Sequence, residues 1–145
     1  MAKQQDNSVI KVSFQIQGKD FNAAGEASSK IKSILQQLGI RSQICRRVAI
    51  VAYEAEMNVV IHADRGVMVL EVHPDHVDLE IVDEGPGIPD LEAVMVEGFS
   101  TAPDYVREMG FGAGMGLPNI KRSSDEFFID SEPDRGVTLR VKINL

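Results

Sequence analysis

The sequence predicts one α+β domain, and two kinds of pattern support this prediction. Apolar residues that alternate with polar ones indicate five strands, at about 9–16, 67–72, 76–83, 126–131 and 137–143. Apolar residues at helical spacing indicate two long helices, at about 21–38 and 43–63. A chain of 145 residues can bury a stable core without disulfides or structural metals.

Composition limits the class of protein before any motif is considered. Charged residues make up 26% of the chain and hydrophobic residues 43%, which is ordinary for a globular domain. No apolar run reaches membrane-spanning length and no secretory signal is visible, so we expect a cytoplasmic protein with no membrane partner. The net charge of −7 argues against a nucleic-acid partner. Cys45 is the single cysteine, which excludes an internal disulfide.

The first half of the chain predicts a strand followed by two helices. The strand at 9–16 is broken by the residues from Gly18 to Asp20. The helix at 21–38 carries one apolar stripe, and Gly39 stands just past its end as a C-cap. Ser42 can cap the next helix, which is apolar nearly all round. We therefore expect this second helix to lie buried between layers.

The polar exceptions on the second helix are its informative residues. Glu54, Asn58 and His62 recur at every fourth position and form one stripe. Buried polar groups without partners cost about 1–3 kcal/mol each, so the stripe should face a cleft or a ligand. The alternatives are a row of surface polar residues and, for His62, a partner of the helix dipole. Glu56, about 200° round the helix from Glu54, is interpreted as a solvated or helix-end charge.

A hairpin turned by Pro74 and Asp75 follows, and its second strand runs into a glycine loop. Asp83 stands at the end of this strand, and Gly85 and Gly87 flank a proline. A carboxylate beside bare backbone suits a ring that bears an amine, because the acid accepts its N–H and the glycines allow close approach. The alternative is a type II turn with a solvated acid.

The next stretch changes character. Residues 89–96 show helical spacing, whereas 97–116 are rich in glycine and poor in aliphatic residues, which predicts a mobile loop. The glycines alternate just before a helix that begins near Leu117, a pattern typical of a phosphate-binding helix start. A flexible linker is the alternative. The alternating glycines are Gly110, Gly112, Gly114 and Gly116.

Three motifs thus occur in a fixed order along the chain. They are Glu54-x3-Asn58-x3-His62 on a helix, Asp83-x-Gly85-x-Gly87 after a strand, and the glycine run 110–116 before a helix. Together they resemble the ATP-binding (GHKL) superfamily of gyrase, histidine kinases, mismatch-repair ATPases and the heat-shock chaperone of that fold. Within it, the chain is similar to the bacterial anti-sigma-factor serine/threonine kinases and related switch kinases, from the first strand to residues 138–140.

This resemblance implies a fold and a pair of cofactors. The fold would be an α/β sandwich of the Bergerat ATP-binding type, with a mixed, mostly antiparallel sheet and helices on one face. Residues 1–145 would form a single histidine-kinase-like ATP-binding domain. The implied cofactors are ATP or ADP and Mg²⁺.

The resemblance also implies a role for each motif residue. Glu54 would be the catalytic general base, Asn58 would coordinate Mg²⁺ through its carbonyl oxygen, and His62 would belong to the nucleotide-binding stripe. Asp83 would bind the adenine amine, with Gly85 and Gly87 beside it. The glycine-rich loop would form a lid whose backbone N–H groups bind the phosphates, through Gly110, Gly112, Gly114 and Gly116. Thr138 would support the adenine pocket. Strict alternation along the last strand turns Thr138 outward unless Gly136 introduces a bulge.

The implied function is an ATP-dependent serine/threonine protein kinase of a partner-switching, anti-sigma type pathway that phosphorylates a small antagonist protein. The alternative is a non-catalytic ATP-binding module that binds partners according to nucleotide state. Glu54 distinguishes the kinase from the non-catalytic module, because a protein that only binds nucleotide needs no buried general base. The sequence leaves open whether a sigma factor is a further partner and whether the chain forms a homodimer.

Overall fold

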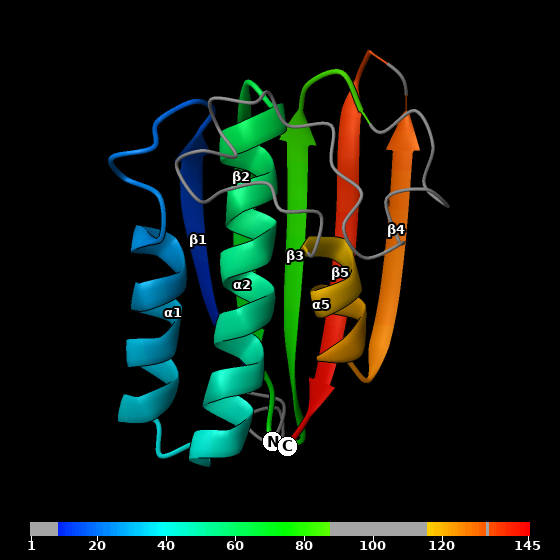
Figure 1. The fold of residues 1–145 in the computed structure, drawn as a ribbon. Helices are drawn as coiled ribbons and strands as arrows, with labels where there is room; N and C mark the ends of the chain where they lie inside the picture. The colour runs from blue at the N-terminus through cyan, green and yellow to red at the C-terminus, as the bar shows by residue number, and fades with distance from the viewer. Residues whose placement is uncertain (1–8, 88–115, 133) are drawn as a thin grey trace, which may run out of the picture.

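The computed structural model describes residues 9–87, 116–132 and 134–145, and its strands form one five-stranded sheet (Figure 1). All of its pairings are antiparallel, so the mostly antiparallel sheet is confirmed and the expected mixed character is not seen among the described strands. The strands, in their order across the sheet, are β1 (Ile10–Gln17), β2 (Arg65–Val72), β3 (His76–Glu84), β5 (Gly136–Asn144) and β4 (Glu126–Glu132).

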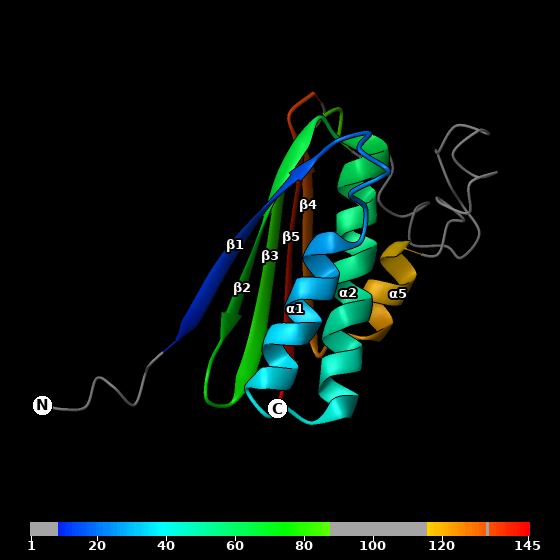
Figure 2. The same ribbon diagram turned by 90° about the vertical axis from the view of Figure 1, so that its left-hand side faces the viewer.

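The described helices cover one face of this sheet (Figure 2). They are α1 (Glu26–Gln37), α2 (Ser42–His62) and α5 (Gly116–Arg122). The core lies between the layers, where side chains such as Val51 and Val59 of α2 meet Leu70 and Leu79 of the sheet, all four at most 1% exposed. The expected α/β sandwich is thereby confirmed. In the described ranges, no helix combines the length and the apolar character needed to cross a membrane.

The helix ends differ from the prediction in two places. α1 begins at Glu26 rather than near residue 21, because Gly25 ahead of it takes a left-handed φ of 95°. Its end agrees with the prediction, since the Gly39 N–H donates to the Gln36 carbonyl and the Ile40 N–H to the Leu35 carbonyl, as in a Schellman motif.

The predicted cap at Ser42 is wrong. Arg41 occupies the N-cap position of α2 and Ser42 is already helical, with no side-chain capping bond at this end. The carbonyl of Arg41 accepts the first hydrogen bonds of the helix, from the N–H groups of Ile44 and Cys45, each at 3.0 Å. The helix therefore starts one residue earlier than predicted, at the residue whose side chain was expected to cap it.

Glu56 joins the two long helices. It is only 2% exposed, so the expectation of a solvated charge is wrong. Its carboxylate accepts the N–H groups of Gly25, Ala27 and Ser28, at 3.0, 3.3 and 3.0 Å. These are backbone donors at the N-terminus of α1, which an anion stabilises. Glu56 is thus a helix-end charge, but for α1 rather than for its own helix.

Close backbone contacts fix the C-terminal end of α2 against the sheet. A Cβ added to Gly18 would lie 1.9 Å from the carbonyl oxygen of Ala63, and one added to Gly85 would lie 2.9 Å from its Cα. Lys19 donates its backbone N–H to the Val60 carbonyl at 2.7 Å, and its ammonium group donates to the Ile61 carbonyl. The end of α2 is therefore locked between the end of β1 and the loop after β3.

We predict that Glu56→Ala lowers the free energy of unfolding by about 3 kcal/mol or more, because each buried donor left without an acceptor costs about 1–3 kcal/mol. Urea denaturation followed by circular dichroism measures this loss. Glu56→Gln, which keeps one acceptor oxygen, should fall between the wild type and the alanine variant.

The control is Glu126→Ala, which removes an exposed ion pair with Lys142 and should cost less than about 1 kcal/mol. Equal stability of the two alanine variants would contradict the role of Glu56 as the anchor of α1.

Candidate functional site

The predicted stripe on α2 faces α5. Glu54, Asn58 and His62 are all half-buried. Glu54 Oε2 accepts a hydrogen bond from Asn119 Nδ2 on α5 at 2.8 Å. A Cβ added to Gly116, the first residue of α5, would lie 3.3 Å from Asn58 Oδ1. The stripe is therefore not a row of freely exposed surface residues, and its first two members lie against the helix that follows the glycine run.

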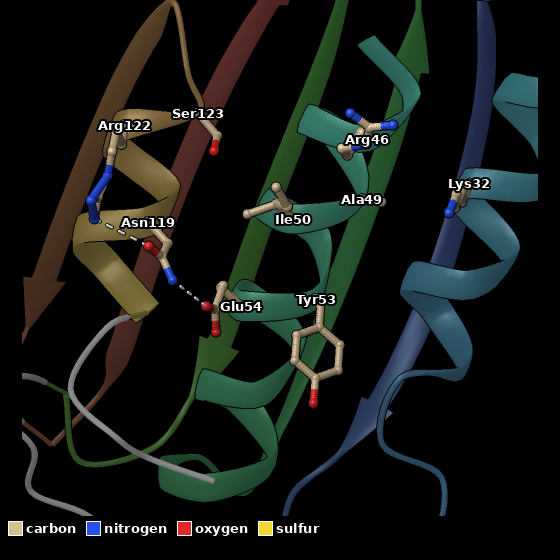
Figure 3. Close-up of a pocket in the computed structure, with 9 residues that line it drawn as sticks. All are labelled: Lys32, Arg46, Ala49, Ile50, Tyr53, Glu54, Asn119, Arg122 and Ser123. Atoms are coloured by element: carbon tan, nitrogen blue, oxygen red, sulfur yellow. Dashed lines mark hydrogen bonds between the residues drawn. The ribbon is translucent and has the colours of Figure 1, made fainter. Parts of the chain in front are cut away.

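Asn119 is a site residue that the sequence analysis missed. Its amide nitrogen donates to Glu54, and its Oδ1 accepts a hydrogen bond from Arg122 at 3.1 Å (Figure 3). The i to i+3 spacing of Asn119 and Arg122 on one helix face was the available signal. It did not reveal Glu54 as the partner, because 65 positions separate Asn119 from Glu54. The arrangement holds one carboxylate oxygen of Glu54 in a fixed direction.

Asp83 lies at the end of β3 with its carboxylate held by the neighbouring strand. Its Oδ1 accepts the Val137 N–H at 2.9 Å. Burial raises the pKa of this carboxyl, and the hydrogen bond from Val137 opposes the rise. Oδ2 makes no hydrogen bond to any residue that the structure describes. Asp83 is therefore a half-buried strand residue rather than a solvated acid in a turn, and its second oxygen has no hydrogen-bond partner among the described residues.

Glycines shape the surroundings of Asp83. Gly136 has a φ of 145°, and a Cβ there would lie 2.1 Å from the Asp83 carbonyl oxygen and 2.8 Å from Oδ1. Gly66, the cross-strand partner of Asp83, leaves room for Val59 of α2. Gly87 has a φ of 79°, and its Cβ would lie 2.7 Å from the Glu132 carbonyl oxygen. The sequence did not identify Gly66 and Gly136 as neighbours of Asp83, because only the folded sheet brings them beside it.

Thr138 is a correction. The register pairs Thr138 with Val82 on one side and with Asp130 on the other, with no bulge at Gly136. Val82 is 45% exposed, on the face of the sheet that carries no described helix, whereas Leu139 points into the core. The Thr138 side chain therefore lies on the outer face and does not line a pocket with Asp83. The predicted role of Thr138 in the adenine pocket is wrong, because strand alternation is maintained.

The surroundings of His62 favour its neutral form. Burial lowers its pKa, and the nearby positive charge of Lys19 lowers it further. The cation that interacts with the carbonyl end of α2 is Lys19, which donates to Ile61. The alternative of His62 as a charged dipole partner is therefore not supported. The imidazole can serve as a hydrogen-bonding group.

A cavity of about 610 Å³ lies beside Glu54 on the outer side of the helical layer. Its floor is partly apolar, since Ile50 and Tyr53 are 39% and 41% exposed. Figure 3 shows Lys32 on α1 at one side and Arg122 on α5 at the other. We call this the α1–α2–α5 groove. The residues that line it are Lys32, Arg46, Ala49, Ile50, Tyr53, Glu54, Asn119, Arg122 and Ser123.

Part of the predicted site lies outside the described residues. This holds for the helix expected at 89–96, for the loop predicted up to residue 115, and for Gly110, Gly112 and Gly114. Gly116 is described, and the helix predicted from near Leu117 is confirmed as α5.

Comparison with known proteins gives consistent matches over most of the chain. The profile of the family described as "Histidine kinase-, DNA gyrase B-, and HSP90-like ATPase" matches residues 44–145. The Serine/threonine-protein kinase RsbT of Bacillus subtilis (strain 168) is 32% identical over 113 residues, which cover 75% of this chain and 79% of that protein. The Anti-sigma F factors of Bacillus velezensis and Bacillus licheniformis are 33% and 32% identical over 121 residues, covering 79% of this chain and 80% of each relative.

The raised pKa of Asp83 predicts a pH effect on stability. The ordinary pKa of an aspartate is about 3.8, and the Asp83 carboxyl keeps its proton to a higher pH in the folded state than in the unfolded state. The folded state then binds more protons, so stability falls as the pH rises through this window. The wild type should therefore lose stability relative to Asp83→Asn as the pH rises above 3.8. Denaturant titrations at a series of pH values measure the difference.

Asp125 supplies a control of opposite sign. Its pKa is lowered, first by the hydrogen bond from the Asn144 N–H, so its favourable contribution is lost as the pH falls below 3.8. Asp125→Asn should reduce that acid sensitivity. Parallel pH curves for the wild type and Asp83→Asn would contradict the burial of the Asp83 charge.

Proposed function

Because the chain belongs to the family of histidine kinase-, DNA gyrase B- and HSP90-like ATPases, we propose that it is an ATP- and Mg²⁺-dependent protein serine/threonine kinase. Its substrate is a small antagonist protein of a partner-switching pathway. Similarity to a protein named serine/threonine-protein kinase and to proteins named Anti-sigma F factor supports this proposal. The observation that carries it is Glu54, a carboxylate that is oriented by Asn119 and borders an open groove.

The described residues are suited to a nucleotide with its metal ion. One carboxylate oxygen of Asp83 has no partner among the described residues and could accept a hydrogen bond from an amine. Gly136 has no side chain, so its backbone lies directly against the Asp83 carboxylate. Asn58 offers a neutral carbonyl oxygen, a ligand that Mg²⁺ accepts. ATP with Mg²⁺ would supply the phosphoryl group for transfer. Asp83 would hold the adenine ring of the nucleotide. The nucleotide site would be completed by His62 and by the glycines 85, 87, 110, 112, 114 and 116.

The order of these groups along α2 suits phosphoryl transfer. Asp83 lies beside the C-terminal end of α2, where Gly85 contacts Ala63. Each four-residue step back along the helix from His62, to Asn58 and then to Glu54, covers about 6 Å. A nucleotide bound with its base at Asp83 would thus extend its phosphates toward Asn58 and Glu54. Glu54 would accept the proton of the attacking serine or threonine hydroxyl.

The α1–α2–α5 groove is the route by which a protein hydroxyl reaches Glu54. Lys32, Arg46 and Arg122 place three cationic side chains around it, although the whole chain carries a net charge of −7. Its apolar floor at Ile50 and Tyr53 offers contact area for a partner side chain. We therefore propose that the substrate presents its hydroxyl on a surface that combines acidic residues with at least one apolar side chain.

Glu54→Gln should reduce the rate of phosphoryl transfer by about 10² or more while nucleotide affinity stays near the wild-type value, because a positioned base acts only in the chemical step. Asn58→Ala should instead weaken the Mg²⁺-dependent part of nucleotide binding. Phosphoryl transfer from labelled ATP to candidate antagonist proteins measures the first effect, and calorimetry with and without Mg²⁺ measures the second.

Glu80→Gln is the control, since it makes the same change on an exposed residue paired with Arg140 on the outer face. Both properties should be unchanged in this variant. If the wild type binds nucleotide but labels no antagonist protein, the chain is a nucleotide-dependent binding module and the kinase proposal fails.

Arg46→Glu should lower kcat/KM for the protein substrate at least about tenfold, which is roughly 1.4 kcal/mol, because it places a like charge opposite an acidic partner. The KM for ATP should stay unchanged. The matched control is Lys30→Glu, a charge reversal at an exposed position of α1 that does not line the groove. Equal effects of the two reversals on kcat/KM would exclude a specific role for the groove.

A further inference from the structure

The turn between β2 and β3 brings two histidines together on the outer face of the sheet. The His73 N–H donates to the His76 carbonyl at 2.8 Å, which closes the turn around Pro74 and Asp75. The two imidazole rings stack with centroids 4.2 Å apart and planes 11° apart. Two of the three histidines of the chain therefore lie in contact, although neither belongs to the site described above.

Carboxylates converge on these rings from the neighbouring strand positions. Asp78 Oδ2 lies 3.2 Å from Nε2 of His73 and 3.2 Å from Nε2 of His76. Glu71, the cross-strand partner of Asp78, places Oε1 3.2 Å from the same nitrogen of His73. One ligand atom each from His73, His76 and Asp78 lies within 4.8 Å of the other two. The three side chains are therefore near enough to one another to bind a single ion together.

Asp75 fixes the orientation of one ring. Its Oδ1 lies 2.7 Å from Nδ1 of His76, and the hydrogen bond from His76 holds the pKa of Asp75 below its ordinary value. A proton on Nδ1 that is donated to a carboxylate leaves the Nε2 lone pair for a metal, the arrangement that carboxylates impose on metal-binding histidines. Nε2 of His76 is the atom that points at Asp78.

We propose that His73, His76 and Asp78 form a site for a divalent transition-metal ion of the Zn²⁺ class, with Glu71 as a further ligand and Asp75 as the group that orients His76. Two imidazole nitrogens with one or two carboxylate oxygens suit Zn²⁺, whereas Mg²⁺ and Ca²⁺ take oxygen ligands. The lone pair of each nitrogen lies in its ring plane. At least one of the stacked rings therefore rotates when the ion binds.

This site is separate from the nucleotide site. Seven steps of about 3.3 Å separate His76 from Asp83 along β3, or about 23 Å. Asp78 alternates with the inward-facing Val77 and Leu79, so the cluster lies on the face opposite the helices. Zn²⁺ bound here does not compete with Mg²⁺ at Asn58, and the proposal is independent of kinase activity.

The test is titration of Zn²⁺ into the full chain, prepared without an affinity tag and freed of metal with a chelator. Calorimetry should show about one Zn²⁺ per chain. His73→Ala, His76→Ala and Asp78→Ala should each lower the affinity at least tenfold, and Asp75→Asn should lower it by about tenfold, the lower end of the range for orienting residues. His62→Ala removes the remaining histidine and should bind as the wild type does.

A second measurement needs no variant. Nitrogen-15 NMR of the wild-type histidine rings should show Nε2 shifts for His73 and His76 on addition of Zn²⁺, and none for His62. Thermal unfolding should move to higher temperature with Zn²⁺, because the ion binds the folded hairpin. Zn²⁺ affinity that survives His76→Ala, loss of affinity in His62→Ala, or unshifted Nε2 signals of His73 and His76 would each overturn the proposal.

Discussion

The burial of α2 is the constraint on which the rest of the structure depends. Val48, Val51 and Val59 are fully buried in the core, so a polar side chain on this helix must find a partner or a cleft. Glu56 satisfies this requirement with three backbone N–H groups of α1. Glu54 satisfies it with Asn119 of α5. One helix thereby positions both of its neighbours, through a structural carboxylate on one side and a candidate catalytic carboxylate on the other.

These two glutamates show what the sequence could and could not reveal. The four-residue spacing of Glu54, Asn58 and His62 was visible because a helix repeats locally. The role of Glu56 was not visible, because its partners are backbone groups of residues 25–28, about thirty positions away, and backbone donors carry no sequence signature. The same limit explains why Asn119 was missed. Long-range partners of polar groups are set by packing, which local periodicity does not encode.

Strand predictions succeeded for a related reason. Alternation placed the described strands within two residues of their observed bounds, and Asp83 was identified at the strand end because a glycine loop follows it. The alternation also predicted that Thr138 faces outward, and the role expected for it from family resemblance is the one that failed. Strand alternation and the adenine-pocket role implied for Thr138 disagreed, and the register of the sheet agrees with the alternation.

The alternation of side chains along β3 also places the candidate nucleotide site and the proposed metal site on opposite faces of the sheet. Val77, Leu79 and Ile81 face the helices, and Asp83 continues this series at the end of the strand. His76 and Asp78 belong to the opposite series, together with the exposed Val82. The neighbouring strand β5 donates a hydrogen bond to Asp83 from the backbone N–H of Val137 rather than from a side chain. A substitution at residue 137 or 138 therefore leaves this hydrogen bond available, except for proline at 137, which has no N–H. In contrast, any side chain at Gly136 would clash with Asp83 itself.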